Sequence, residues 1–172
     1  GMGQGLILAT GDVNNALGPN NSGSSSLGGG NMGQTDPDLE ILANPQSVND
    51  AAVLEFDFVP TGDSLKFDFV FASDEYLEFV NSVNDIFGFF LSGPGISGPF
   101  SNNSANIALI PNTTDPVTIN TVNDVVNSTY YVVNGTGINF PYNGNAMYPQ
   151  YDGFTVVITA QAEVICGQTY HI

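Results

Sequence analysis

Oxygen-bearing side chains are concentrated between residues 73 and 85 of the chain. The stretch opens with Ser73-Asp74-Glu75-Tyr76 and closes with Asn84-Asp85, and Glu78 lies between these two groups. Hard cations such as Ca²⁺ take six to eight oxygen ligands from carboxylates, amide side chains and backbone carbonyls. The sequence therefore predicts a calcium site, with Ca²⁺ as the expected cofactor, formed by Asp74, Glu75, Asn84 and Asp85.

The same acidic stretch has a plainer interpretation, because its spacing matches no EF-hand loop. Ser73 and Asp74 are residue types that cap a following turn, so the acids could form a solvated or hydrogen-bonded corner without a metal. A second and weaker candidate for a metal site combines three acids from an earlier part of the chain, Asp36, Asp38 and Asp50.

Paired carboxylates are also the groups that hydrolyse glycosidic bonds. Asp74 with Glu78, or Glu75 with Asp85, would be the pairs. The sequence gives no sign of their separation, and a glycoside hydrolase is our third choice. His171 is the only histidine, which disfavours a nucleophile-base triad or a zinc site. We expect no catalytic residues.

Aromatic residues in a late segment rich in Gly, Asn and Pro suggest a ligand-binding surface. Tyr142, Tyr148 and Tyr151 have ring faces suited to stacking on sugars, and neighbouring amides suit hydrogen bonds to hydroxyl groups. The alternative is that these rings fold back to cover the end of the core.

Two alternating apolar runs must position the acidic stretch. Residues 54–58 and 65–71 place a large apolar side chain at every second position, a period of two that is typical of a strand with one buried face. Turn residues at 60–63 separate the runs, so we expect a β-hairpin. A third run, residues 86–91, ends in a glycine-proline turn.

The rest of the chain shows short strand patterns between turn signals. We expect a first strand at residues 5–10 and one helical turn at 38–42, followed by a loop with a helical turn at 76–83. Further strands are expected at 106–110, 117–119, 129–133, 154–165 and 169–172. This pattern predicts an all-β fold, an antiparallel β-sandwich or jelly roll with long Asn-, Gly- and Ser-rich loops.

Composition limits the possible partners. The 172 residues amount to a single domain, and 17 acids against Lys66 alone give a formal charge of −16. Nucleic acid is excluded because phosphate neutralisation needs clustered Lys and Arg. No apolar stretch is long enough for membrane insertion. Cys166 lies in an apolar run, so we expect a small buried side chain.

Three segments carry a resemblance to a known family. Residues 50–60, the sequence Phe71-Ala72-Ser73-Asp74-Glu75-Tyr76, and residues 84–95 together resemble the choice-of-anchor L family. Residues 6–12, 106–111 and 151–155 fit the same pattern, so the resemblance covers nearly the whole chain. It implies a secreted or cell-surface bacterial β-domain without known catalytic activity.

Taking the resemblance together with the acidic stretch and the late tyrosines, we expect an extracellular adhesion or carbohydrate-recognition module, stabilised by calcium, whose partner is a glycan or a cell-surface protein. The alternative is a structural subunit of a surface filament or layer. Similar domains run on past Ile172 with a further strand, so the domain is expected to lack its C-terminal strand, and identical subunits would then associate through an open sheet edge. Asp63-Ser64-Leu65 resembles a bacterial O-glycosylation motif, with Ser64 as the modified residue.

Overall fold

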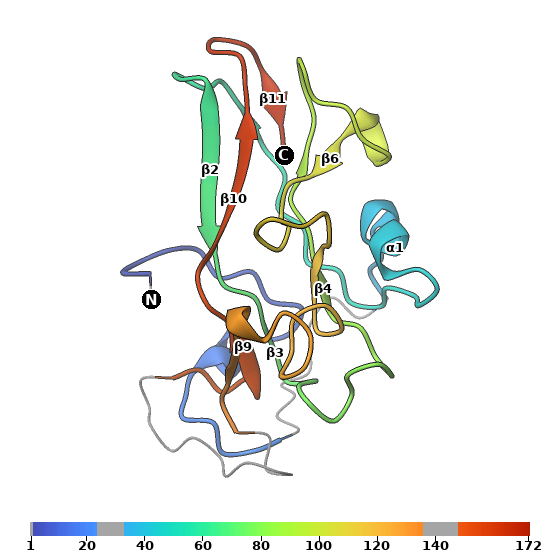
Figure 1. The fold of residues 1–172 in the computed structure, drawn as a ribbon, viewed down its shortest axis with the longest axis vertical. Coiled ribbons are helices and arrows are strands. Elements are labelled where there is room, and N and C mark those ends of the chain that lie inside the picture. Colours follow the sequence, from blue (N-terminus) through green and yellow to red (C-terminus); the bar gives the residue numbers. More distant parts are fainter. Residues whose placement is uncertain (1, 24–32, 136–147) are drawn as a thin grey trace.

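A computed structural model describes residues 2–23, 33–135 and 148–172 of the chain. In these residues short strands dominate, joined by long irregular segments and a single α-helix (Figure 1). The strands are β1 (Asp57–Phe58), β2 (Ser64–Phe69), β3 (Ala72–Ser73), β4 (Ile86–Phe87), β5 (Phe90–Leu91), β6 (Ala105–Asn106), β7 (Val117–Thr118), β8 (Tyr131–Val133), β9 (Gly153–Thr155), β10 (Ile158–Glu163) and β11 (Tyr170–His171). The helices are α1 (Pro37–Ala43) and three 3₁₀ turns, η1 (Val13–Ala16), η2 (Ser101–Asn103) and η3 (Ser128–Tyr130).

All pairs between these strands are antiparallel, in sheets of two or three strands. They pair as β1–β11, β2–β10, β4–β7 and β5–β6, together with a three-stranded sheet in the order β3–β9–β8. The predicted all-β, antiparallel class is confirmed. Packing as a sandwich or jelly roll remains a prediction.

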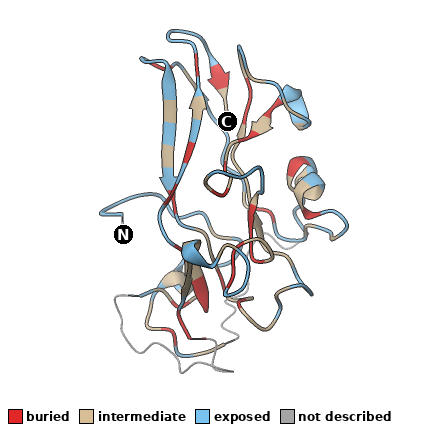
Figure 2. Cartoon of the chain, in the orientation of Figure 1, coloured by how far each residue is buried: buried red, intermediate tan, exposed pale blue. Residues whose placement is uncertain are grey.

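The longest ladder joins β2 to β10, from Ser64 opposite Glu163 to Phe69 opposite Ile158. Along β2 the exposed residues alternate with residues that face the core, as the period of two predicts; the alternation is visible as bands in Figure 2. Phe69 is buried, whereas Lys66 and Asp68 are exposed.

The predicted β-hairpin between residues 54–58 and 65–71 is wrong. β1 pairs with β11 and β2 pairs with β10, so each run finds its partner about a hundred residues away. The first run is also less buried than its pattern indicates, because Leu54 is 51% exposed and Phe56 42%. The turn at residues 60–63 instead connects β1, which pairs with β11, to β2, which pairs with β10.

The ends of the chain bring two corrections. Residues 5–10 form no strand, and the side chains of Leu6, Ile7 and Leu8 are exposed. Cys166 is exposed in a turn closed by a hydrogen bond from the amide of Gln168 to the carbonyl of Ile165, so the predicted burial of Cys166 is wrong. Residues 5–10 lack a sheet partner that would cover them, whereas the second run is buried at Val164 and becomes exposed only where β10 has ended, which period and composition alone cannot show.

The expected helical turn at residues 38–42 is confirmed as α1. Asp36 caps it, accepting hydrogen bonds from the amides of Asp38 and Leu39, and Pro37 occupies the first turn. The expected turn at residues 76–83 is also present, since the amide of Phe79 donates to the carbonyl of Glu75.

Aromatic rings fill the centre of the core. Phe69 packs against Phe87 and Phe89 with ring centroids 4.8 Å and 5.7 Å apart, and Phe67 lies 5.3 Å from Phe89. Buried aliphatic side chains from β7, β10 and residues 108–122 surround these rings. A second apolar cluster contains Leu91, Val164, Tyr170 and Ile172.

Candidate functional site

The three-stranded sheet brings two distant carboxylates together. β3 and β9 lie side by side (Figure 1). Ser73 of β3 lies opposite Gly153 of β9, so the next position in register places Asp74 across from Asp152. On the other side of β9, the amide of Asn134 donates to the carbonyl of Asp152 at 2.9 Å. One end of the β3–β9–β8 sheet therefore carries the acids.

Two tyrosine rings close over the same end of the sheet. Tyr76 and Tyr131 pack with ring centroids 4.8 Å apart. A Cβ atom on Gly153 would lie 2.6 Å from Cε2 of Tyr131 and 2.7 Å from Cδ2 of Tyr76. Glycine is required there because the rings approach the β9 backbone directly beside Asp152.

Buried amide side chains tie the early loop to the late loop around Asp152. The Asn20 amide group donates to Oδ1 of Asp152 at 2.8 Å and to the carbonyls of Asn134 and Gly135 at 3.0 Å and 2.8 Å. The Gln150 amide donates to Oδ1 of Asn20 and to the carbonyl of Ser22. This amide network fixes the backbone that carries Asp152.

A second set of hydrogen bonds organises the first acidic stretch. The hydroxyl of Ser73 donates to Oδ2 of Asp85 at 2.7 Å and accepts from the amide of Glu75 at 2.9 Å. Asn15 donates to Oδ2 of Asp74 at 3.2 Å. Ser73 thus caps the following turn, as predicted. The acids Asp74, Glu75 and Asp85 lie around this cap.

Burial and mutual repulsion raise the pKa of four acids in this group. Burial, followed by the charge of Asp152, raises the pKa of Asp74 to about 7. Burial also raises the pKa of Asp152 to about 6, against a lowering contribution from the Asn20 hydrogen bond and with added repulsion from Glu78 and Glu75. The pKa values of Glu75 and Asp85 are raised chiefly by burial.

Several buried oxygen atoms in this region have no hydrogen-bond partner within the described residues. They include Oδ1 of Asp74, Oδ2 of Asp152, Oε2 of Glu78, Oδ1 of Asn84 and the hydroxyls of Tyr76 and Tyr131. Buried polar atoms are normally paired, so these oxygens need a proton, a water molecule or a cation. We call Asp74, Glu75, Glu78, Asp85 and Asp152 the acidic cluster.

The structure brings most of the predicted metal ligands into one neighbourhood. Ser73 links the Glu75 amide to the Asp85 carboxylate, and the charges of Glu75 and Asp85 both contribute to the raised pKa of Asp74. Asp152 was not among the sequence-predicted ligands. Its only sequence signal is a position directly before a strand. Among the described residues, no group of three or more His, Cys, Asp or Glu residues could hold a metal ion.

The three acids of the second predicted metal site, Asp36, Asp38 and Asp50, make separate interactions. Asp36 caps α1, and Oδ1 of the buried Asp38 accepts from the amide of Ser101 at 2.8 Å. Asp50 is exposed and forms a bridge with Gln34. Hydrogen bonding therefore accounts for Asp36 and Asp38 without a metal.

Two of the three predicted ligand-binding tyrosines lie in the late loop beside Asp152. Tyr148 is 42% exposed and packs at a centroid distance of 6.1 Å from Phe154, while Tyr151 is partly buried. Tyr142 lies outside the described residues. Ser64, the predicted glycosylation residue, is exposed at the start of β2.

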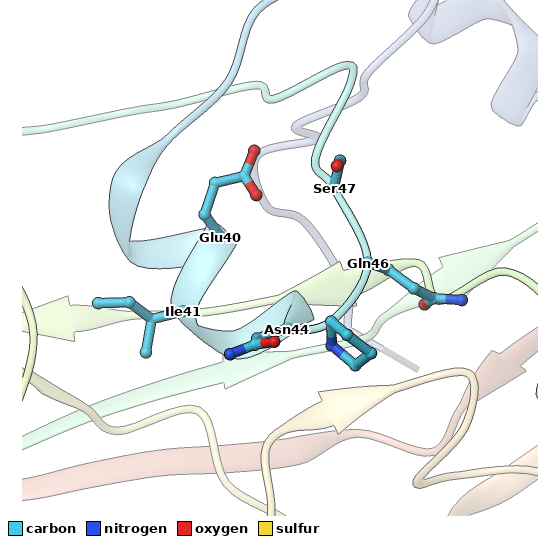
Figure 3. A pocket seen from close by; sticks show the side chains of 6 residues that line it. Glu40, Ile41, Asn44, Gln46 and Ser47 are labelled. Carbon is cyan, nitrogen blue, oxygen red and sulfur yellow. The ribbon is translucent and has the colours of Figure 1, made fainter.

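A shallow hollow of 310 Å³ lies beside α1 (Figure 3). Its lining comes from α1 and the segment that follows: Glu40, Ile41, Asn44, Pro45, Gln46 and Ser47. The Glu40 carboxylate accepts from the hydroxyl of Thr35 and the amide of Val48. Since its one carboxylate is engaged and it shares no residue with the acidic cluster, the hollow adds nothing to the site.

Comparison with known proteins gives one match. The family model described as the choice-of-anchor L domain matches residues 1–172. Neither a curated protein nor a solved structure matches the chain. Within the described segments no helix is long and apolar enough to cross a membrane.

Proposed function

The chain belongs to the choice-of-anchor L domain family, and we propose that it is a non-catalytic adhesion or carbohydrate-recognition module with calcium-stabilised loops. The family is one of surface-associated bacterial modules and is not a known enzyme family. An extracellular location agrees with this membership and with an acidic surface of net charge −16.

The observation that carries the proposal is an exposed aromatic ring on a firmly held loop. Tyr148 presents 42% of its surface to solvent. Two residues further on, Gln150 is buried in the amide network, and the Asn134 amide donates to the carbonyls of Pro149 and Tyr151. A ring held on a rigid backbone loses little entropy when a sugar stacks on it, which favours recognition.

A glycan array probed with the purified chain in the presence of Ca²⁺ tests this function. We expect saturable binding to a subset of glycans and loss of that binding in Tyr148→Ala. Phe56→Ala is the matched control, because Phe56 is also 42% exposed and also packs at 6.1 Å from one neighbouring ring, that of Phe58. Equal losses in both variants, or no glycan bound by the wild type, would refute the carbohydrate-recognition function.

A structural role in a surface filament is the second candidate, and the exposed segment at residues 6–8 favours it. Leu6, Ile7 and Leu8 are 73%, 61% and 51% exposed and pair with no strand of the described chain. Two-stranded sheets such as β2–β10 have open edges that accept an added strand. In this assembly an apolar run of one copy completes a sheet of the next.

Light scattering after size-exclusion chromatography separates the two functions. A filament subunit forms oligomers whose mass grows with concentration, and Leu6→Ser combined with Leu8→Ser returns the protein to a monomer. A wild-type chain that is monomeric up to millimolar concentration excludes assembly through this segment and leaves the recognition module as the only candidate.

A further inference from the structure

β1 is the outermost strand of its sheet. On one side it pairs with β11, and His171 of β11 exchanges backbone hydrogen bonds with Ser92 on the side away from β1, at 2.9 Å and 3.0 Å. No strand of the described residues pairs with the other side of β1. An open edge of this kind presents unpaired N–H and C=O groups and is a template for an added strand.

The register of β1 shows which backbone groups are free. Phe56 exchanges both of its backbone hydrogen bonds with Ile172, at 2.9 Å and 3.1 Å, so it is a bonded position. Bonded and non-bonded positions alternate in an antiparallel ladder, and at the non-bonded positions the N–H and C=O groups point away from the partner strand. Those positions are Glu55, Asp57 and Val59. Their backbone groups make no hydrogen bond within the described part of the chain.

The apolar face of β1 is incompletely covered as well. Phe58 stacks on Tyr170 at a centroid distance of 5.9 Å and so contacts the second apolar cluster. Leu54 and Phe56 share this face, because side chains alternate along an extended chain, yet they are 51% and 42% exposed. Free backbone groups and uncovered apolar side chains therefore coincide at this edge.

Residues 5–10 have the matching properties of an unpaired strand. Leu6, Ile7 and Leu8 are exposed, and the backbone of residues 2–11 makes no hydrogen bond to any described residue. About six residues is the usual length of a strand. When this segment is extended, Leu6 and Leu8 lie on one of its faces and Ile7 lies on the other.

Charge distinguishes between the possible occupants of the β1 edge. Pairing of two β1 strands from different copies brings Glu55 and Asp57 of each copy together, and like charges opposite one another are destabilising. Residues 2–11 contain no charged side chain. In a chain of net charge −16, this segment can approach the acidic edge without adding repulsion.

The position of residues 5–10 favours a donor from a second copy. Hydrogen bonds from Asn15 to Asp74 and from Asn20 to Asp152 hold the chain that follows the segment. In Figure 1 the N-terminal stretch lies beyond the lower end of β2, whereas β11, the partner of β1, stands beside the upper end. The segment is thus separated from β1 of its own copy along the longest axis of the molecule.

We propose that residues 5–10 of one copy add as a strand to the outer edge of β1 in a second copy. Leu6 and Leu8 then cover Leu54 and Phe56, and the free backbone groups of both segments gain partners. Donor and acceptor are different surfaces, so the contact is heterologous and builds an open filament unless its rotation closes a ring. The inference rests on the filament role, the second candidate function, and specifies its contact; it does not depend on glycan recognition.

Hydrogen–deuterium exchange of the full chain, at concentrations where it is monomeric and where it is assembled, tests the contact. We expect the amides of residues 6–8 and those of Glu55, Asp57 and Val59 to exchange at least about tenfold more slowly in the assembled protein. Amides of the β2–β10 ladder are the internal reference, and their exchange should not change.

Three other results would overturn the contact, and they differ in what they leave standing. Slower exchange in β2 or β10 instead of β1 would refute this acceptor and retain the filament role. A chain that stays monomeric at every concentration would refute both. Slow exchange of residues 6–8 and of β1 already in the monomer would mean that the segment pairs within its own copy.

Matched variants separate this contact from general apolar aggregation. Leu54→Ser combined with Phe56→Ser removes the acceptor surface, and we expect a monomer. Val125→Ser combined with Val126→Ser is the control, because it removes apolar side chains that are 81% and 43% exposed outside β1, and it should assemble as the wild type does. Equal losses would refute the proposal. If the first variant does not fold, Glu55→Pro removes one outward N–H and keeps the β1–β11 bonds, and wild-type assembly of that variant contradicts the proposal.

Discussion

Tyr170 shows how a single buried side chain connects distant segments of this chain. Its ring is 1% exposed, and its hydroxyl donates to the carbonyl of Pro94 at 2.6 Å and accepts from the amide of Ile165 at 2.8 Å. Tyr170→Phe keeps the ring but leaves both backbone groups unpaired. We expect a loss of about 1–3 kcal/mol in the free energy of unfolding, measured by urea denaturation.

Tyr130→Phe is the control for the hydroxyl change. Tyr130 is partly exposed, and its hydroxyl has no hydrogen bond in the described part of the chain. We expect a change within about 0.5 kcal/mol. A similar loss in both variants would mean that the Tyr170 hydroxyl bonds contribute little.

His171 makes the stability of the β1–β11 pair depend on pH. Its Nδ1 lies 2.8 Å from Asp57 and its Nε2 lies 3.7 Å from Glu55, and the hydrogen bond to Asp57 is the main reason that the pKa of His171 is raised above 6.5. Because the folded state holds the proton more tightly, the stabilisation is complete below pH 6.5 and is lost as pH rises through the folded pKa.

His171→Asn removes this proton-dependent contribution and retains a side-chain donor. At pH 5.5 we expect the wild type to melt at a higher temperature than the variant. The corresponding difference in the free energy of unfolding is about 0.2–1 kcal/mol, because the pair is exposed and screened. By pH 9 the difference should be smaller. Asp74 and Asp152, with pKa values of about 7 and 6, titrate in both proteins, so only the difference isolates His171. A difference that grows with pH contradicts this account.

Among the structural elements, β2 has two faces of very different importance. Phe69 is 6% exposed and contacts the rings of Phe87 and Phe89, so Phe69→Ala should cost about 3–5 kcal/mol in denaturant unfolding. Lys66→Gln changes the exposed face and should alter stability by no more than about 0.5 kcal/mol. Comparable effects on the two faces would show that β2 is not packed as described.

Alternation along the sequence was sufficient to predict the faces of β2, because side-chain direction in a strand is a local property. The partner of β2 is not local. Turn residues between two alternating runs favour a hairpin, yet β2 pairs with β10 and β1 pairs with β11. The pairing is decided by which strands bury the aromatic core together, and no short-range pattern contains that information.

For the site too, the sequence predicts what is local and does not predict what depends on long-range strand pairing. Asp74, Glu75 and Asp85 are close in sequence, and their proximity could be predicted from one acidic stretch. Asp152 joins them through the register of β3 and β9, and its carboxylate accepts a hydrogen bond from Asn20 of the early loop. Residues 5–10 illustrate the opposite error, since an apolar run without a partner remains exposed.

For the whole molecule, the dominant physical feature is a net charge of −16 with almost no opposing positive charge. Such an excess destabilises a compact chain through self-repulsion, and any added salt will relieve part of it. At 0.15 M ionic strength the Debye length is about 8 Å, so the repulsion that remains is mainly between close carboxylates. The acidic cluster is the place where such carboxylates are also buried.

The most direct test of the calcium-stabilised module is therefore a thermal melt at pH 7.5 and 150 mM NaCl, in EDTA and then with 10 mM Ca²⁺ or 10 mM Mg²⁺. If the dissociation constant is near 10⁻⁴ M, Ca²⁺ should add about 2.7 kcal/mol and raise the melting temperature by several degrees, clearly more than Mg²⁺ at equal charge. Equal rises in melting temperature with the two ions would contradict the account. So would a melting temperature in Ca²⁺ that equals the one in EDTA.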